Sequence, residues 1–109
     1  MAYTARITWE TLRTVDSATF TGIYLPVGGP LLHPSYICKL VNNSTVLVTI
    51  SLDGVTDIDV APASSFWLYD EGKLGGGRDA AIPEGTQIFV KGAAGTGLVY
   101  LVSQYIIQN

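Results

Sequence analysis

The sequence predicts an all-β protein: an antiparallel two-sheet β-sandwich, jelly-roll-like, with about eight short strands and little or no helix. Strand-favouring residues are abundant, because Val, Ile and Thr account for 30 residues and eleven aromatic residues join them. Apolar residues recur with a period of two, whereas no stretch of ten or more residues carries an uninterrupted 3.6-residue apolar period. Turn signals separate the alternating runs, which is typical of a sandwich or a small barrel.

The length and the low charge indicate one folded unit. A chain of 109 residues has the size of one domain, so we expect residues 1–109 to share a single core. Charged residues make up 14% of the chain and apolar residues 48%, which excludes extensive disorder. Because few charges are available to keep the surface hydrated, either Ser and Thr side chains or another subunit must cover it.

The N-terminal part is expected to begin with a strand over 3–12. One face of this strand is apolar and the other polar; the apolar side chains are Tyr3, Ala5, Ile7 and Trp9, and the polar ones are Thr4, Arg6, Thr8 and Glu10. A second strand is expected over 18–25. The segment 26–34 is rich in Gly and Pro, which cannot form a regular ladder, so we expect a long connection there.

Turn signals divide the middle of the chain. Asn42-Asn43-Ser44 predicts a tight hairpin between strands at 35–42 and 45–52, because Asn tolerates positive φ. The second of these strands has an apolar face made of Val46, Val48, Ile50 and Leu52. Asp53-Gly54 and Ala61-Pro62-Ala63 predict the next two turns, and strands at 56–61 and 64–70 follow from them.

The C-terminal part combines one long connection with two strands. The segment 71–85 contains five glycines and a large share of the charged residues, and connections of that length are usually functional or mobile. Strands are expected at 86–92 and 97–107. The last of these is apolar on both faces in part, as an inner strand covered on two sides is, and this favours a sandwich over a barrel.

Residues that could carry chemistry are few. Cys38, the only cysteine, lies in an apolar run and is expected to be buried and unreactive. His33 is the only histidine, and the sequence has no G-x-S-x-G motif whose serine it could activate. We therefore expect a surface or packing role for His33 and no enzymatic activity. Asp53, Asp57 and Asp59 are weak candidates for a calcium site, but their spacing does not match an EF-hand loop. We therefore expect no cofactor and no metal.

The run 66–69 carries bulky apolar side chains on both faces of its strand. Phe66 and Leu68 lie on one face, and Trp67 and Tyr69 on the other. If one face fills the core, the other needs a cover, and the low charge of the chain favours a neighbouring subunit over a loop of the same chain. Long connections also order readily on a partner. The expected interface residues are Leu31, His33, Trp67, Tyr69, Lys73, Leu74, Arg78 and Tyr100.

The chain as a whole resembles small accessory structural proteins of tailed bacteriophage virions. The resemblance rests on an asparagine turn, an S-x-D-G turn, a V-x-P-A-S-S step into an aromatic strand and a closing strand that carries tyrosine. These features lie within the segments 1–10, 41–44, 51–57, 60–70, 85–92 and 104–105. The resemblance implies a β-sandwich subunit without catalytic residues that self-associates and docks on the neck, tail or head of the particle.

The resemblance also implies the partners and the location. The expected partners are further copies of the chain and other virion proteins, and the expected location is the virion, assembled in the bacterial cytoplasm. The net charge of −3, without a basic run, argues against nucleic acid, and no apolar stretch approaches the length of a membrane span. The alternative function is a carbohydrate- or receptor-binding module that uses Trp67 or Tyr69 with Asp57 and Asp59.

Overall fold

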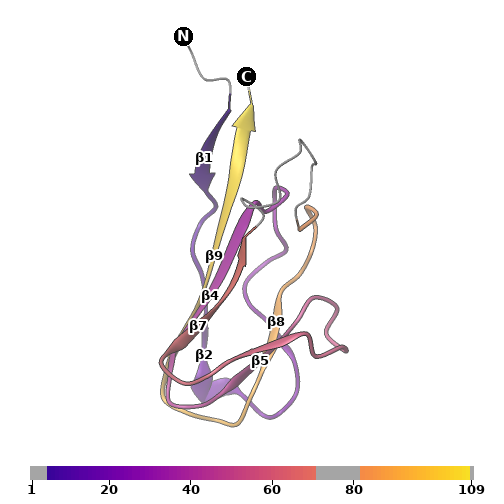
Figure 1. The fold of residues 1–109 in the computed structure, drawn as a ribbon. Coiled ribbons are helices and arrows are strands. Elements are labelled where there is room, and N and C mark those ends of the chain that lie inside the picture. The colour runs from indigo at the N-terminus through magenta and orange to yellow at the C-terminus, as the bar shows by residue number, and fades with distance from the viewer. Residues whose placement is uncertain (1–4, 71–81, 109) are drawn as a thin grey trace.

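The computed structural model describes residues 5–70 and 82–108 and shows a two-sheet antiparallel sandwich (Figure 1). The strands within these residues are β1 (Ala5–Trp9), β2 (Arg13–Asp16), β3 (Leu25–Pro26), β4 (Ile37–Ser44), β5 (Val48–Ser51), β6 (Asp59–Ala61), β7 (Ser65–Asp70), β8 (Phe89–Lys91) and β9 (Gly97–Gln108). One short 3-10 turn, η1 (Ser17–Thr19), accompanies them. The predicted all-β sandwich is confirmed.

The strand order is that of a jelly roll. The first sheet has the order β1-β9-β4-β7, with β2 beside β9 next to β1, and the second has the order β3-β8-β5-β6. The antiparallel pairs are nested along the chain, since β2 pairs with β9, β3 with β8, β4 with β7, and β5 with β6. This is a long hairpin rolled up so that successive pairs alternate between the two sheets, which is the double Greek-key winding of the jelly roll.

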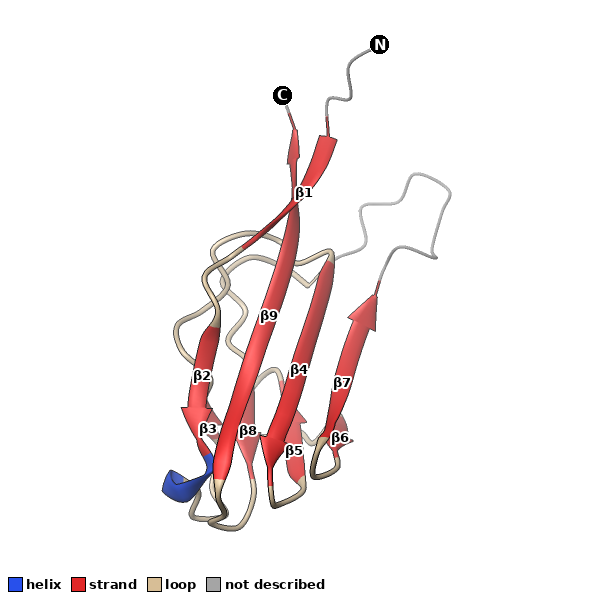
Figure 2. Cartoon of the chain, turned by 90° about the vertical axis from the view of Figure 1, so that its left-hand side faces the viewer, coloured by secondary structure: helices blue, strands red, loops and turns tan. Residues whose placement is uncertain are grey.

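The core lies between the two sheets, which Figure 2 shows one behind the other. The first sheet contributes Cys38, Leu40, Trp67, Val99 and Leu101, and the second contributes Val48, Ile50, Ala61 and Val90. The connections add Phe20, Val27, Leu31, Ile82 and Ile88. The predicted apolar face of the strand around Val48 and Ile50 is confirmed, and the Cys38 thiol is buried as expected.

Strand β9 is the longest element and organises the first sheet. It pairs with β4 from Gly97 to Gln104 and with β2 and β1 on its other edge, so it is an inner strand as predicted. Beyond Gln104 its pairing within the described residues is with β1 alone. The two strands therefore leave the sandwich as a ribbon, which rises above the other strands in Figure 2.

The first predicted strand is interrupted at Glu10. Instead of one strand over 3–12, β1 ends at Trp9 and β2 begins at Arg13. The predicted faces are also wrong at this point, because Trp9 is 60% exposed and Glu10 is buried. The Glu10 carboxylate turns inward because the backbone N–H groups of Leu32 and His33 donate hydrogen bonds to it there.

The second predicted strand, over 18–25, is wrong except at its end. The carboxylate of Asp16 accepts a hydrogen bond from the backbone N–H of Ala18 and so caps the turn η1. The Ser17 hydroxyl, which is buried, donates to the carbonyl of Gly97 at the start of β9. These local bonds hold the chain in a turn, and regular pairing resumes only at Leu25.

The predicted hairpin at Asn42–Ser44 is also wrong. These three residues are the last part of β4, and β5 lies in the other sheet. Asn42 is completely buried, and its side-chain amide donates to the carbonyls of Val46 and Ala61. The polar residue that looked like a turn signal is therefore a buried connector between the sheets.

The later predicted turns are confirmed. Asp53 and Gly54 lie in the turn after β5, where Gly54 has φ +80° and the Asp53 carboxylate accepts from the backbone N–H groups of Val55 and Thr56. Residues 62–64 connect β6 to β7 and carry the chain from one sheet to the other. Of the predicted connection 71–85, the structure describes 82–85, where Ile82 forms an isolated bridge with Ser35.

Candidate functional site

The strongest candidate site is the surface of the first sheet that points away from the core. We call it the outer face. Cross-strand register places Leu68, Lys39 and Val102 in one row and Phe66, Val41 and Tyr100 in the next. A further row, at the start of β4, consists of Asp70, Ile37 and Gln104, with Trp9 beside it on β1. Apolar residues thus dominate the first two rows across β7, β4 and β9, and the third row is mixed.

The alternation of the strands explains why these side chains are outside. Residues with odd numbers on β4 point outward, while Cys38, Leu40 and Asn42 between them are buried. On β7 the same alternation leaves Phe66 56% exposed and Leu68 47% exposed. The first sheet is therefore apolar on both sides.

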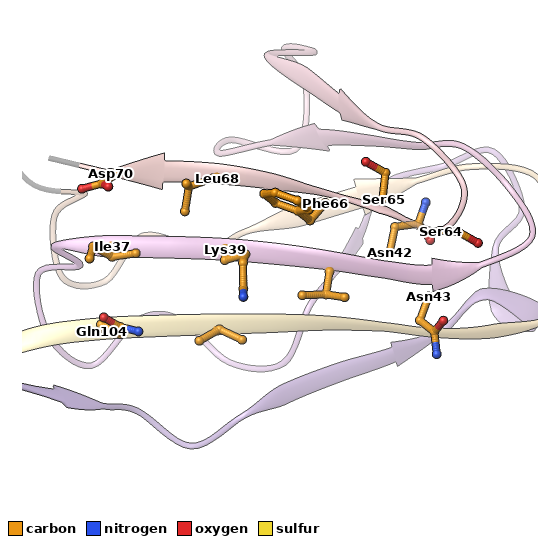
Figure 3. A pocket seen from close by; sticks show the side chains of 12 residues that line it. Ile37, Lys39, Asn42, Asn43, Ser64, Ser65, Phe66, Leu68, Asp70 and Gln104 are labelled. Carbon is orange, nitrogen blue, oxygen red and sulfur yellow. The ribbon is translucent and has the colours of Figure 1, made fainter. Parts of the chain in front are cut away.

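The outer face is hollowed along β4, as Figure 3 shows from close by. The groove has a volume of about 580 Å³ and is bounded by side chains of β7 on one side and β9 on the other. Phe66 and Leu68 project into it from β7, and Lys39 stands on its floor. Asn43 and Ser64 add polar groups at one end, and Asp70 and Gln104 add them at the other. The arrangement is suited to burying apolar surface.

The corresponding surface of the second sheet carries a polar cluster. Lys91, opposite Thr49 on that sheet, forms an ion pair with Asp57 at 3.2 Å and lies 4.6 Å from the centre of the Tyr24 ring. The Tyr24 hydroxyl donates to Asp57. Burial, together with this bond to a carboxylate, raises the pKa of Tyr24 to about 12, and the bonds from Tyr24 and Lys91 lower the pKa of Asp57. The polar groups around Lys91 therefore satisfy one another, while Val60, opposite Thr49 on β6, is 45% exposed.

A second polar cluster ties the predicted connection 26–34 to the first sheet. The buried Glu10 carboxylate accepts from the Arg13 guanidinium at 2.8 Å and from the backbone N–H of His33 at 2.7 Å, and it lies 3.0 Å from His33 Nδ1. Arg13 also donates to the carbonyls of Gly29 and Pro30. The His33 ring stacks on Tyr105, with ring centres 3.7 Å apart.

The ionisation of Glu10 follows from these contacts. Burial opposes the charge on the carboxylate, but the hydrogen bonds from Arg13, Leu32 and His33 outweigh it, so the pKa of Glu10 is lowered. The histidine and the carboxylate fasten a connection to the sheet. We interpret the cluster as a structural clasp.

The structure distributes the predicted interface residues unevenly. Tyr100 lies on the outer face and is half-buried, and His33 is in the clasp with 43% of its side chain exposed. Trp67 and Leu31 are in the core, with exposed fractions of 9% and 2%, so their assignment to the surface is wrong. Tyr69, on the same side of β7 as Trp67, packs against the core. Lys73, Leu74 and Arg78 lie outside the described residues.

The outward face of β7 is therefore the one that carries Phe66 and Leu68. The alternation of two apolar faces was readable from the sequence, but nothing in a single strand says which face meets the second sheet. Trp67 lies inside because its cross-strand neighbour on β4 is Leu40, and the side chain of Leu40 is completely buried. For this reason the sequence did not identify four of the outward residues as interface residues: Phe66, Leu68, Val41 and Lys39. For Glu10, the acid at the end of an alternating run three residues before Arg13 was the only signal.

The three aspartates do not form a metal site. Asp53 caps its own turn, Asp57 binds Tyr24 and Lys91, and the Asp59 carboxylate accepts from the backbone N–H of Val60. Across residues 5–70 and 82–108, no three His, Cys, Asp or Glu side chains converge closely enough to hold a metal ion. Of the two aromatic residues in the alternative carbohydrate site, Trp67 is buried between the sheets.

The environment of Cys38 makes its thiol unreactive. Burial raises the pKa of the Cys38 thiol to about 12, which keeps it protonated and unreactive at neutral pH. The described part of the chain has no helix with the length and apolar character needed to cross a membrane.

Comparison with family models, with curated proteins and with solved structures gave no significant match to this chain.

Proposed function

We propose that this protein is a non-enzymatic structural subunit of a bacteriophage virion that works by docking its outer face against other proteins of the particle. The observation that carries the proposal is the composition of that face. It exposes Phe66 and Leu68 beside Val41 and Val102 on a regular sheet, in a chain with only 14% charged residues. A contiguous apolar surface of this kind is typical of a protein–protein interface.

The fold supports the same proposal by analogy. Jelly-roll sandwiches recur in viral capsid domains, and also in lectins and cupins, so the fold is compatible with a virion subunit but is not specific to one. The sequence resemblance to accessory virion proteins points in the same direction. The one His side chain is held by Glu10 and stacked on Tyr105, which is consistent with a structural role.

The proposal is tested with purified particles from a phage whose genome encodes this chain. We expect mass spectrometry to find the chain in the particles at a fixed ratio to the major capsid protein. Phe66→Asp, which places a charge on the outer face, should lower its incorporation at least tenfold. Val55→Asp, an exposed position in the loop after β5, is the matched control and should be incorporated normally.

Two results would contradict the proposal. One is the absence of the chain from particles purified to constant composition. The other is equal incorporation of the Phe66→Asp and Val55→Asp variants, which would show that the outer face has no part in assembly. Circular dichroism and thermal melting of both purified variants confirm that neither substitution prevents folding.

A further inference from the structure

We infer that Asp53-Gly54 is a latent site of isoaspartate formation, and that the Ser51 hydroxyl keeps it from reacting while the chain is folded. The inference goes beyond the proposed function and does not depend on it. Asp followed by Gly is the aspartyl dipeptide that rearranges most readily, because glycine has no side chain to hinder its backbone nitrogen. The dipeptide occurs once in the sequence, in the turn after β5.

The reaction needs no enzyme and no reactant other than water. The backbone nitrogen of Gly54 attacks the carbon of the protonated Asp53 carboxyl group. A nitrogen–carbon bond forms, the bond from that carbon to its hydroxyl breaks, and the hydroxyl leaves with the N–H proton as water. A second water molecule then opens the resulting succinimide ring at the backbone carbonyl, so that the main chain runs through the side chain of Asp53. The reaction therefore requires a free Gly54 nitrogen and a free, protonated Asp53 carboxyl group.

The first argument is that the nitrogen is not free. The Ser51 side chain is completely buried, and its hydroxyl oxygen accepts from the backbone N–H of Gly54 at 2.9 Å and from that of Asp53 at 3.2 Å. The Gly54 nitrogen must leave this bond before it can attack. The turn also packs against β8, since a Cβ built on Gly54 would lie 3.4 Å from the Phe89 ring. The ring limits how far the turn can move.

The second argument is that the carboxyl group is neither free nor protonated. One oxygen of Asp53 accepts from the Ser51 hydroxyl and from the backbone N–H groups of Val55 and Thr56, each at 2.8 Å. The bonds from Thr56, Val55 and Ser51 hold the pKa of Asp53 well below its usual value, so the protonated form that reacts is depleted. The Ser51 hydroxyl thus binds both reacting groups at once, since it accepts from the nitrogen and donates to the carboxylate.

The rearrangement would damage the hairpin that this turn closes. The turn joins β5 to β6, and across it the backbone N–H of Ile58 donates to the carbonyl of Ile50 at 2.9 Å. Isoaspartate lengthens the main chain by one carbon atom at residue 53 and removes the side-chain carboxylate from the N–H groups that it caps. The modification therefore accumulates in chains that have unfolded and weakens the pairing of β5 with β6 when they refold.

The test uses the purified full chain with Asp53→Asn. Asparagine forms the same succinimide faster, with loss of ammonia, and its side-chain oxygen can accept the same hydrogen bonds. Mass spectrometry of the incubated protein follows the gain in mass on deamidation. We expect the folded Asp53→Asn chain to react at least tenfold more slowly than the same chain in urea. The double variant Asp53→Asn/Ser51→Ala should react at least fivefold faster than Asp53→Asn when both are folded.

Ser17→Ala, added to Asp53→Asn, is the matched control. Ser17 is also completely buried and its hydroxyl also donates a hydrogen bond, but to the carbonyl of Gly97, outside the turn. It should leave the rate of deamidation unchanged while it lowers the stability. If Ser51→Ala does not fold, Ser51→Cys replaces it, because a thiol is close in size and is a weak donor and acceptor. Urea unfolding of each variant gives the unfolded fraction under the conditions of the incubation.

Three results would overturn the inference. Equal rates for Asp53→Asn in buffer and in urea would show that the folded turn gives no protection. Equal acceleration by Ser51→Ala and Ser17→Ala would show that global unfolding controls the reaction. A folded Ser51→Ala or Ser51→Cys variant that reacts no faster than Asp53→Asn alone would show that the Ser51 hydroxyl is not the protecting group.

Discussion

At the scale of single residues, buried polar groups decide the local structure. Asn42 is completely buried in β4, yet each of its side-chain atoms has a partner. The amide donates to Val46 and Ala61, and the side-chain oxygen accepts from the backbone N–H and the hydroxyl of Ser44. These bonds hold the end of β4 to the turn that follows and to β6, and so connect the two sheets.

Asn42→Ala should lower the free energy of unfolding by about 3 kcal/mol, because it removes the amide that donates to the carbonyls of Val46 and Ala61 and the oxygen that accepts from Ser44. Asn43→Ala is the control, since the neighbouring side chain is exposed, and its effect should stay below about 0.5 kcal/mol. Urea unfolding followed by circular dichroism measures both. Similar values for the two variants would contradict the role assigned to Asn42.

Glu10 should make stability depend on pH. Its pKa is lower in the folded chain than the ordinary value of 4.5, so the charged carboxylate stabilises the fold above about pH 4.5. That contribution is lost as the pH falls through the folded-state pKa. Glu10→Gln should lower the free energy of unfolding at pH 7 by about 2 kcal/mol, because Arg13 and His33 lose a charged acceptor.

The measurement is urea unfolding at pH 7 and at pH 3. Glu10→Gln should lose less stability between these two values than the unmodified chain loses. Glu84→Gln, at an exposed position, is the control and should follow the unmodified chain. If Glu10→Gln and the unmodified chain have parallel pH profiles, the clasp does not depend on the charge of Glu10.

At the scale of elements, one glycine permits the start of β9. Gly97 has φ +107°, and a Cβ added there would lie 2.3 Å from the carbonyl oxygen of Asn43 on β4. A side chain is therefore excluded both by the backbone conformation and by the close approach of the paired strand. The register of β9 with β4 begins at this residue, opposite Ser44.

Gly97→Ala should destabilise the protein by roughly 2–4 kcal/mol, because the first pair of the longest ladder must shift. Gly29→Ala is the matched control: nothing lies within 4 Å of its added Cβ, and its backbone needs no positive φ. It should change the stability by less than about 1 kcal/mol, since the unfolded chain alone is affected. Thermal and urea unfolding of both variants provide the comparison. A Gly97→Ala protein as stable as Gly29→Ala would show that β9 can start elsewhere.

At the scale of the whole molecule, the nested pairing determines how the chain must fold. Residues 13–16 pair with 98–101, and 25–26 pair with 89–90, so most strand pairs join segments far apart in the sequence. Among the strands that the structure describes, only β5 and β6 form a local hairpin. Closing the outer pairs costs loop entropy before the contacts of the core compensate for it.

Refolding should therefore be slow for a chain of this size, with a relaxation time between milliseconds and seconds. Stopped-flow dilution from urea, followed by tryptophan fluorescence, measures it, because Trp67 becomes buried on folding. The exposed Trp9 is removed with Trp9→Phe, so that the signal reports on the core alone. Complete refolding within a few microseconds would contradict the nested order of pairing.

The sequence determined the strand class and several strands, because these depend on local properties. The alternation around Val48 and Ile50, the turn at Asp53-Gly54 and the two-sided apolar character of the last strand are all statements about neighbours in the chain, and the structure confirms them. The low charge predicted an apolar surface, and the outer face is that surface.

Only the tertiary structure decided which faces and which polar groups turn inward. Trp67 and Phe66 are equivalent in a single strand, and the second sheet makes the difference by covering the side that carries Trp67 and Leu40. Glu10 and Asn42 look like surface residues until distant donors and acceptors, such as His33 and Ala61, are brought to them. Burial is a property of the packed sheets. The hydrogen bonds that permit it are formed between segments that the sequence keeps far apart.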